Sequence, residues 1–572
     1  MEQSKIKEII SAVIPQSKSE GDKIKKRTVA DTFHIGSLSG NRLNSGTLRS
    51  QFIVCVKEQD WNSCDKPEQR AIHSDQRVFV QIGDDVWDVY TGGSSDAENE
   101  DPIRIYTNVR DLKSLLEQER KKMFLSSERP SELKQIAIVS SNNNKFTPYL
   151  WALRTKPFML LAGISGTGKS RIVREFAFKS CPEYLQDKDG TTPGNYCMIE
   201  VKPNWHDSTE LLGYYSRLGN NPGYQFTKFV KFLVKAKMYP DVPFFVCLDE
   251  MNLAPVEQYF AEILSILETR KAVIGEDGNK NIKTETIIDA EHFKTLGMIG
   301  GFSPDFTDRD IYMKLFNIDT ESDINEAVGK RTDLKNEGLT LPDNVVIIGT
   351  VNMDDTTHQF SRKVIDRAMT IEMNGGNLRN MFGGSKNLEY LPEEEQKKWQ
   401  YSFTRRYVTA DEVLEAHSDV AEDLIEKLPA QLEEINKALK GTPFEVSYRV
   451  LNELTIMVGV MLDEGKKLDD AIAQSVNNIL LMKILPRIEG DAEMFALSRE
   501  YKTKVGVSYD NRLEWLKDIA PDIKKPLTDT ESEDVDTEEK AEAVKEHQPT
   551  AKDKIQEMID RLNNQEFTRF WP

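Results

Sequence analysis

The sequence predicts an α/β protein, in which a parallel sheet is followed by an all-α lid and preceded by a small β-rich (α+β) domain. Three observations lead to this prediction. Short apolar runs alternate with helical stretches between residues 147 and 373, as in a parallel sheet covered on both faces. Residues 396 to about 500 have helical periodicity, and residues 51–106 hold alternating runs separated by Gly and Asp turns. These are the signatures of a helical subdomain and of short strands.

Composition limits the class of protein. A chain of 572 residues is too long for one ordinary core, so we expect about two to four domains. Its 39% hydrophobic and 30% charged residues are typical of a soluble globular protein. No apolar run approaches the roughly 18 residues of a membrane span, and the amino terminus has no signal-peptide core, so we expect a cytoplasmic protein with no membrane contact. Five cysteines without CxxC spacing indicate neither a zinc site nor a disulfide framework.

Pattern changes along the chain divide it into five segments. These are a recognition module (1–130), a large α/β segment (131–395) with an insertion at about 275–342, a helical lid (396–505), an acidic linker (506–550) and a C-terminal helix with an aromatic tip (551–572). The strands expected in the large segment are 158–162, 196–201, 244–248, 345–350 and 368–372. An insertion of this length is usually functional or structured in its own right. The aromatic tip either docks on a partner or packs on its own lid, and both interpretations remain open.

One segment carries a phosphate-binding pattern. Residues 163–170 fit GxxxxGK[ST], directly after an apolar run and directly before a helical stretch, which is the context that a P-loop requires. Backbone N–H groups of such a loop converge on a phosphate at the positive end of a helix. The expected nucleotide-binding residues are Gly163, Ser165, Gly166, Thr167, Gly168, Lys169, Ser170 and Arg171.

Two further strand ends supply polar groups. The apolar run 244–248 ends in Asp249 and Glu250, the layout in which the first acid orients Mg²⁺, together with the Ser170 hydroxyl, and the second polarises the attacking water. The run 345–350 leads to Asn352. A strand between the other two would bring this amide to the γ-phosphate, where positioning and electrostatics govern phosphoryl transfer. An ordinary turn is the alternative for each.

Arginines near the end of the large segment are candidate phosphate ligands. Arg367 directly precedes the last expected strand, where its side chain could reach a nucleotide held by a neighbouring subunit, and Arg362 is the second candidate. Arg449, at a helix start in the lid, is a candidate for contact with the γ-phosphate of its own subunit. A surface salt bridge is an equally good interpretation of each.

With these elements in this order, the chain resembles AAA+ proteins, and within them the McrB-like branch. The strings that carry the resemblance are 202–214, 249–254, 349–355, 448–450 and 483–487, and it covers roughly residues 145–495. The family string Asn-Thr-Ala-Asp-Arg is represented by residues 352–356, which keep Asn352 and the second acid, Asp355, but have Thr356 in place of the arginine. The resemblance implies an AAA+ core with Asp355 among its catalytic residues.

McrB-like proteins are motor subunits of modification-dependent restriction systems. The resemblance therefore implies an NTP-hydrolysing ring, in that family a hexamer, that uses Mg²⁺ and GTP or ATP. It also implies DNA recognition by the N-terminal module and a McrC-like nuclease partner in anti-phage defence. The P-loop sees only phosphates, so both bases remain open. The alternative is a MoxR-like or chaperone-type AAA+ protein that remodels protein complexes without DNA, which the net charge of −19 favours slightly. The basic balance of residues 1–57 keeps a local DNA contact open.

Overall fold

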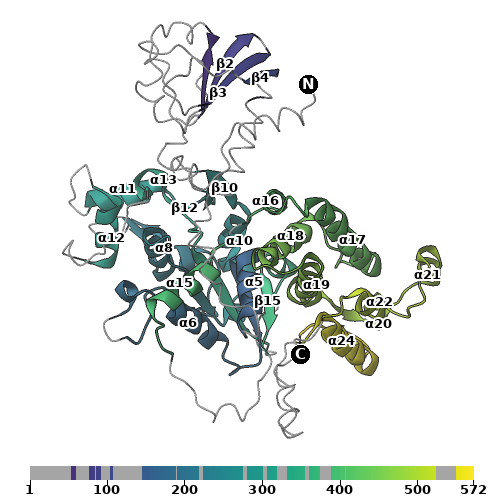
Figure 1. The fold of residues 1–572 in the computed structure, drawn as a ribbon. Helices are drawn as coiled ribbons and strands as arrows, with labels where there is room; N and C mark the ends of the chain where they lie inside the picture. The colour runs from purple at the N-terminus through teal and green to yellow at the C-terminus, as the bar shows by residue number, and fades with distance from the viewer. Residues whose placement is uncertain are drawn as a thin grey trace, which may run out of the picture. The chain divides into compact units, whose positions relative to one another are not determined.

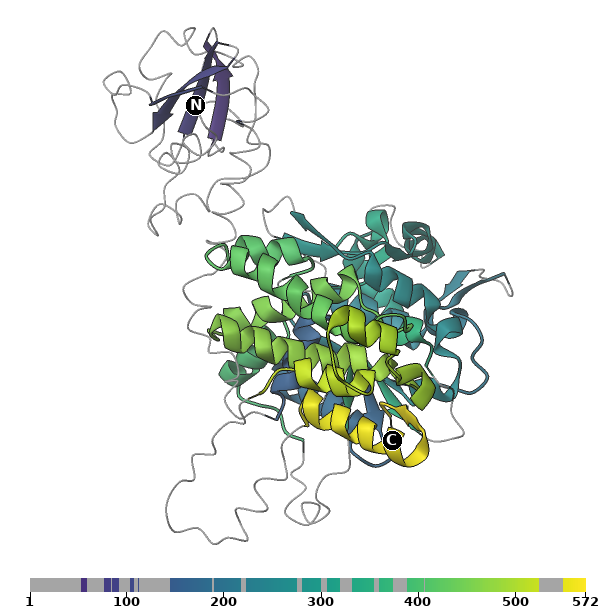
Figure 2. The ribbon, with the colours of Figure 1, turned by 90° about the vertical axis from the view of Figure 1, so that its right-hand side faces the viewer.

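The computed structural model describes residues 53–58, 77–83, 85–91, 103–106, 112, 145–187, 190–217, 223–274, 280–299, 306–318, 332–353, 358, 360–373, 388–405, 407–523 and 549–571. The chain forms two compact units. One comprises residues 1–135 with 272–281, and the other comprises residues 136–271 with 282–572. Figures 1 and 2 show the two units from directions 90° apart.

The first unit contains a four-stranded sheet. Its strands are β1 (Ile53–Lys57), β2 (Arg77–Gly83), β3 (Val86–Thr91) and β4 (Ile103–Tyr106), in the order β1-β2-β3-β4. The first pair is parallel and the other two are antiparallel. Phe79, Trp87 and Ile105 are fully buried on one face of the sheet, and Val78 and Val80, which lie on the other face, are buried as well. The described strands thus agree with the β-rich module that the alternating runs predict.

The second unit is built on a five-stranded parallel sheet. The strands are β5 (Phe158–Gly163), β6 (Tyr196–Glu200), β9 (Phe244–Asp249), β14 (Val345–Asn352) and β15 (Met369–Glu372), in the order β15-β5-β14-β9-β6. All four pairings are parallel. Each expected strand is present within two residues of its predicted ends. The α/β class is therefore confirmed for this unit.

Successive residues of each central strand enter two different cores. In β5, Met159 and Leu161 pack in one core with Phe176, whereas Phe158 and Leu160 pack in the other. The first face is covered by α5 (Thr147–Thr155), α6 (Lys169–Ser180) and α15 (Glu393–Ser402), and the second by α8 (Lys228–Met238), α9 (Val256–Tyr259) and α10 (Ala261–Glu268). Burial on both faces explains why these strands are continuous apolar runs.

The insertion after α10 has secondary structure of its own. It contains β10 (Lys271–Ile274), β11 (Lys280–Lys283), β12 (Thr286–Ile288), α11 (Ala290–Ile299), α12 (Asp308–Phe316), α13 (Leu334–Glu337) and β13 (Leu339–Thr340). The buried Asp308 carboxylate accepts hydrogen bonds from the backbone N–H groups of Leu334 and Lys335 at 2.7 and 3.2 Å. A smaller hairpin, β7 (Tyr214–Ser216) with β8 (Gly223–Gln225), follows α7 (Thr209–Leu212).

The helical lid follows the sheet. Its helices are α16 (Ala410–Ala416), α17 (Ala421–Leu439), α18 (Tyr448–Asp463), α19 (Leu468–Ile479), α20 (Ala492–Phe495), α21 (Arg499–Val505) and α22 (Arg512–Ile519). A π-helical turn, Leu480–Ile484, continues α19. Figure 2 shows this green to yellow part of the chain as one group of adjoining helices.

The predicted acidic linker begins too early. Residues 512–519 form α22, with its Asn511–Glu514 capping box and three buried apolar side chains, Leu513, Trp515 and Leu516. The acids of this stretch suggested a solvated tether, but the apolar positions between them face the lid core. Residues 524–548, the most acidic part, lie outside the described residues.

The C-terminal segment packs on its own lid. Helix α24 (Ala551–Gln565) buries Ile555, Met558 and Leu562, and β17 (Phe567–Arg569) pairs with β16 (Glu489–Asp491). Phe570 is buried in the same core. Of the two interpretations of the aromatic tip, intramolecular packing is the one that the structure supports. Among the described helices, none has the length and apolar character needed to cross a bilayer.

Candidate active site

The P-loop links the end of β5 to the start of α6. Gly166 and Gly168 have φ values of 83° and 85°, in the left-handed region where a β-carbon is costly. Gly168 is the N-cap of α6, a helix of 12 residues. The loop therefore delivers its backbone N–H groups to a helix N-terminus, which is suited to an anion.

Lys169 is buried against the loop. Its Nζ donates to the carbonyl oxygens of Gly163 at 3.0 Å and Ile164 at 2.7 Å. Ser165 and Arg171 are exposed at the loop and on the first turn of α6, and the Thr167 hydroxyl donates to the Ile164 carbonyl at 3.1 Å. These predicted nucleotide-binding residues all lie in one short surface loop around the lysine.

Ser170 and Asp249 are in direct contact. The Ser170 hydroxyl donates to Oδ1 of Asp249 at 2.5 Å, although the two residues are 79 positions apart. Hydroxyl and carboxylate oxygens are ligands that Mg²⁺ accepts. The two candidate metal ligands are thus brought together by the sheet, between the P-loop and the end of β9.

Glu250 and Asn352 form a second contact beside the first. The Asn352 amide, Nδ2, donates to Oε1 of Glu250 at 2.9 Å. Glu250 has φ 51° and ψ 51°, a left-handed conformation that costs about 1–2 kcal/mol for a residue with a side chain. Such strain persists where the surrounding contacts over-determine it, and it is concentrated at functional sites.

The sheet register explains how Asn352 reaches this place. Strand β14 lies between β5 and β9, and Asn352 is paired with Gly163 at the start of the P-loop. A β-carbon at Gly349 would lie 2.4 Å from Sδ of Met251, just after Glu250. A side chain at this position would force the Met251 side chain to move, so glycine favours the close packing of the chain beyond β9 on β14.

Two residues of the site were not anticipated from the sequence. The Thr350 hydroxyl donates to Oδ1 of Asp249 at 2.8 Å and accepts from the backbone N–H of Glu250 at 3.0 Å. The buried Asn252 amide donates to the carbonyl oxygen of Asn352 at 2.9 Å. A hydroxyl in an otherwise apolar strand, two positions before Asn352, was the available signal for Thr350. Asn252 lies in the string 249–254 that carries the resemblance, but no role was predicted for it.

Arg367 and Arg362 lie at the other end of the sheet. Arg367 directly precedes β15 and is half-buried. Within the described part of the chain its guanidinium has no ion pair or hydrogen bond. Arg362, in α14 (Arg362–Ile365), is 4.0 Å from Oε1 of Glu489 and stacks over the Phe444 ring. The guanidinium of Arg367 is thus the more available of the two for contact with a nucleotide.

Arg449 does not reach the P-loop, which corrects its predicted contact with the γ-phosphate of its own subunit. Its Nη2 is 3.0 Å from Glu268, which also pairs with Lys156 at 3.4 Å. Lys156 precedes β5, whereas the P-loop follows this strand of six residues. At about 3.3 Å per residue the two ends are roughly 20 Å apart. Asp355 lies outside the described residues.

The residues present fit a magnesium–nucleotide complex. Left-handed glycines, a buried lysine, a hydroxyl beside a carboxylate, and an acid held by an amide gather at the carboxyl ends of three adjacent parallel strands. That edge is where ligands bind in open α/β sheets.

Comparisons with known proteins find a family model and a solved structure that are similar to parts of the chain. A family model described as a domain of unknown function (DUF8727) matches residues 400–567, that is, the lid together with α24. A crystal structure described as a "putative ATPase" from Cytophaga hutchinsonii matches with a TM-score of 0.31 and 14% identity, covering 73% of this chain and 99% of the other. At that TM-score the likeness supports no conclusion about function. No curated protein matches the sequence.

Proposed function

We propose that the chain is a Mg²⁺-dependent nucleoside triphosphatase that uses GTP or ATP. The observation that carries this proposal is the pair of adjacent contacts, Ser170 with Asp249 and Glu250 with Asn352, beside a glycine-rich helix N-terminus. Together they supply a metal-binding pair and an oriented base.

Each group has a defined task. Lys169 and the loop N–H groups would neutralise the β- and γ-phosphates, and Ser170 and Asp249 would hold Mg²⁺, which would offset charge on the phosphate oxygens. Glu250 accepts a hydrogen bond from the attacking water and orients it. Asn352 fixes the Glu250 carboxylate and can itself donate to a phosphate oxygen, so the chemistry depends on positioned groups.

Completion by a second copy is part of the proposal. Arg367 lies at the amino end of β15, a strand length from the P-loop of its own subunit, with no ion pair or hydrogen bond to another described residue. An arginine supplied in trans stabilises charge in the transition state of phosphoryl transfer. We infer a ring oligomer in which Arg367 acts on the neighbour's nucleotide.

The wider role rests on the resemblance to McrB-like proteins. If the chain acts as McrB-like proteins do, the ring drives DNA translocation or activates a McrC-like nuclease, and the N-terminal module recognises the DNA. Protein remodelling of the MoxR type is the second candidate, favoured by the net charge of −19. Direct measurement of DNA binding distinguishes the restriction role from protein remodelling.

Substitution of Glu250 tests the hydrolytic site. Glu250→Gln keeps the hydrogen bond from Asn352 but removes the charge that polarises water, so we expect turnover to fall by about 10²–10³-fold with unchanged nucleotide affinity. Phosphate release and binding of a fluorescent nucleotide measure the two quantities. Glu257→Gln, an exposed residue of α9, is the matched control. Turnover at the wild-type rate in the Glu250 variant would exclude the proposed role.

A further inference from the structure

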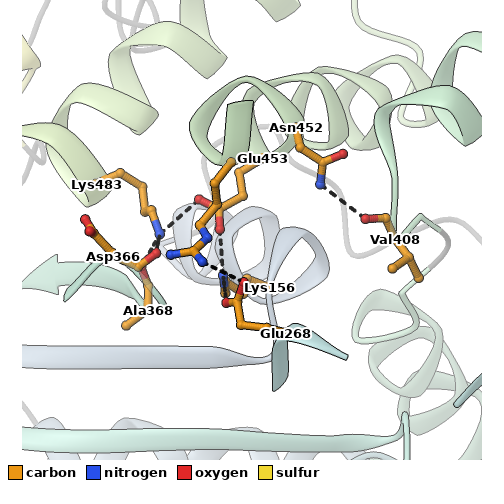
Figure 3. Close-up of polar contacts among 9 residues, drawn as sticks. Lys156, Glu268, Asp366, Ala368, Val408, Asn452, Glu453 and Lys483 are labelled. Carbon is orange, nitrogen blue, oxygen red and sulfur yellow. Dashed lines mark hydrogen bonds and ion pairs between the residues drawn. The ribbon is translucent and has the colours of Figure 1, made fainter. Parts of the chain in front are cut away.

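A lysine of the lid holds the backbone on both sides of Arg367. Lys483, in the π-helical turn after α19, donates from Nζ to the carbonyl oxygens of Asp366 at 2.6 Å and Ala368 at 3.0 Å. Figure 3 shows its ammonium group directed at these two residues. The residue between them is Arg367. Its backbone is thus fixed from both sides by a single side chain, which lies 117 positions beyond Asp366 along the chain.

The ammonium group is kept charged by a buried acid. Lys483 is 2% exposed, and burial lowers its pKa to about 8. Glu453 of α18 pairs with it at 2.9 Å, and with Lys156 at 2.7 Å (Figure 3). Burial acts to raise the pKa of Glu453, but the two ammonium groups outweigh it and hold that pKa below its ordinary value.

A second contact from the lid reaches the same segment. Nε of Arg487, just beyond the π-helical turn, is 2.9 Å from Oδ1 of Asp366. Lid residues therefore bind the backbone on both sides of Arg367 and the side chain of its predecessor. The guanidinium of Arg367 itself has no such partner among the described residues, so its position depends on the backbone that carries it.

The buried Lys483 and the π-helical turn that carries it are both energetically unfavourable, which indicates a functional role. A buried ammonium group stabilises a fold poorly compared with an apolar side chain of similar volume. A π-helical turn is also less favourable than a continuous α-helix and is often found at functional sites. Here the turn contains the lysine that contacts the segment of Arg367.

We propose that Lys483 is a positioning residue for Arg367, and that it couples the conformation of the lid to the trans action of this arginine. The proposal rests on the proposed function, since Arg367 has a role only if a neighbouring nucleotide is hydrolysed. When the lid of one subunit moves relative to its sheet, the carbonyl oxygens of Asp366 and Ala368 move with Lys483. The state of one site is thereby passed to the next subunit.

The test compares turnover per subunit over a range of protein concentrations. Arg367→Ala is expected to reduce the concentration-dependent rate by about 10³-fold. Lys483→Met should reduce it by about 10–100-fold, the effect of misplacing a group by about 1 Å, with nucleotide affinity unchanged. The double variant Lys483→Met/Arg367→Ala should be no slower than Arg367→Ala alone, because Lys483 acts only through that arginine.

Lys156→Met is the matched control. It removes a lysine that is similarly buried and pairs with the same Glu453 but touches neither carbonyl beside Arg367. We expect its turnover to stay within about twofold of wild type, because one lysine still neutralises Glu453. Equal losses in the two lysine variants would show a general effect on lid stability and overturn the proposal.

The remaining outcomes separate this proposal from the one that it rests on. If Arg367→Ala lowers turnover and Lys483→Met does not, or if their effects add, the positioning role fails and the nucleotide site stands. If Arg367→Ala changes nothing, the trans arginine and the positioning role fail together. Should Lys483→Met not fold, Lys483→Arg keeps a buried cation but changes the geometry of its contacts with the carbonyl oxygens of Asp366 and Ala368, and unchanged turnover in that variant overturns the proposal.

Discussion

At the scale of single residues, hydrogen bonds with neighbouring side chains fix the positions of the two acids of the site, Asp249 and Glu250. Asp249 accepts from both Ser170 and Thr350, and the same threonine accepts from the N–H of Glu250. One hydroxyl therefore fixes the side chain of the proposed metal ligand, Asp249, and the backbone of the proposed base, Glu250. Because Glu250 is held in a left-handed conformation, losing this contact should release it.

Thr350→Val tests this role. Valine keeps the shape but leaves the buried N–H of Glu250 without its acceptor, so we expect a loss of about 1–3 kcal/mol in the free energy of unfolding, together with slower turnover. Chemical denaturation and phosphate release measure the two effects. The control is Thr370→Val in β15, whose buried hydroxyl has no hydrogen-bond partner among the residues that the structure describes and whose removal should cost nothing. Equal losses in both variants would contradict the bridging role of Thr350.

At the scale of elements, α24 belongs to the lid and also reaches the sheet. Lys554 is fully buried and pairs with Glu372 at 2.8 Å. Glu372 ends β15 opposite Ala162, and the next residue, Met373, donates to the Ala162 carbonyl at 2.7 Å. The C-terminal helix is therefore tied to the strand end that lies beside the P-loop.

Lys554→Met should be strongly destabilising. Glu372 would be left as a buried, uncompensated charge, for which a cost of about 3–5 kcal/mol is expected. The double variant Lys554→Met/Glu372→Gln should recover much of the loss, because no buried charge remains. Thermal and urea unfolding measure both. Lys552→Met, which removes a pair with the exposed Asp522, should cost less than about 1 kcal/mol. A comparable loss there would contradict the assigned importance of the buried pair.

At the scale of the whole molecule, the chain forms one compact unit that carries the proposed nucleotide site and a second that is β-rich. The site and the lid are built within residues 136–572, apart from the short stretch 272–281 that belongs to the other unit. Overall charge opposes a nucleic-acid ligand, with a net value of −19. DNA binding by this protein therefore requires a local basic surface.

The salt dependence of DNA binding by the full chain distinguishes the two candidate roles. A DNA-reading protein should bind plain or modified duplex with log K falling linearly with log salt, at about −0.9 per phosphate contact. Residues 136–572 alone should lose this binding if the β-rich unit is responsible. Fluorescence anisotropy measures the affinities. No binding of either duplex at low salt would favour protein remodelling and would contradict a role in restriction.

The sequence alone determined the sheet, the P-loop and the strand-end acids, because each is a local pattern. Apolar runs indicate strands that are buried on both faces. The P-loop pattern places glycines at positions 166 and 168, where the backbone has positive φ. The tertiary structure alone decided which distant groups meet. Thr350 joined the site through strand register, and Arg449 was separated from the P-loop by the length of β5. Lys483 was brought to the two neighbours of Arg367 by the packing of the lid. Such contacts depend on the packing of elements far apart in the chain, which no local pattern specifies.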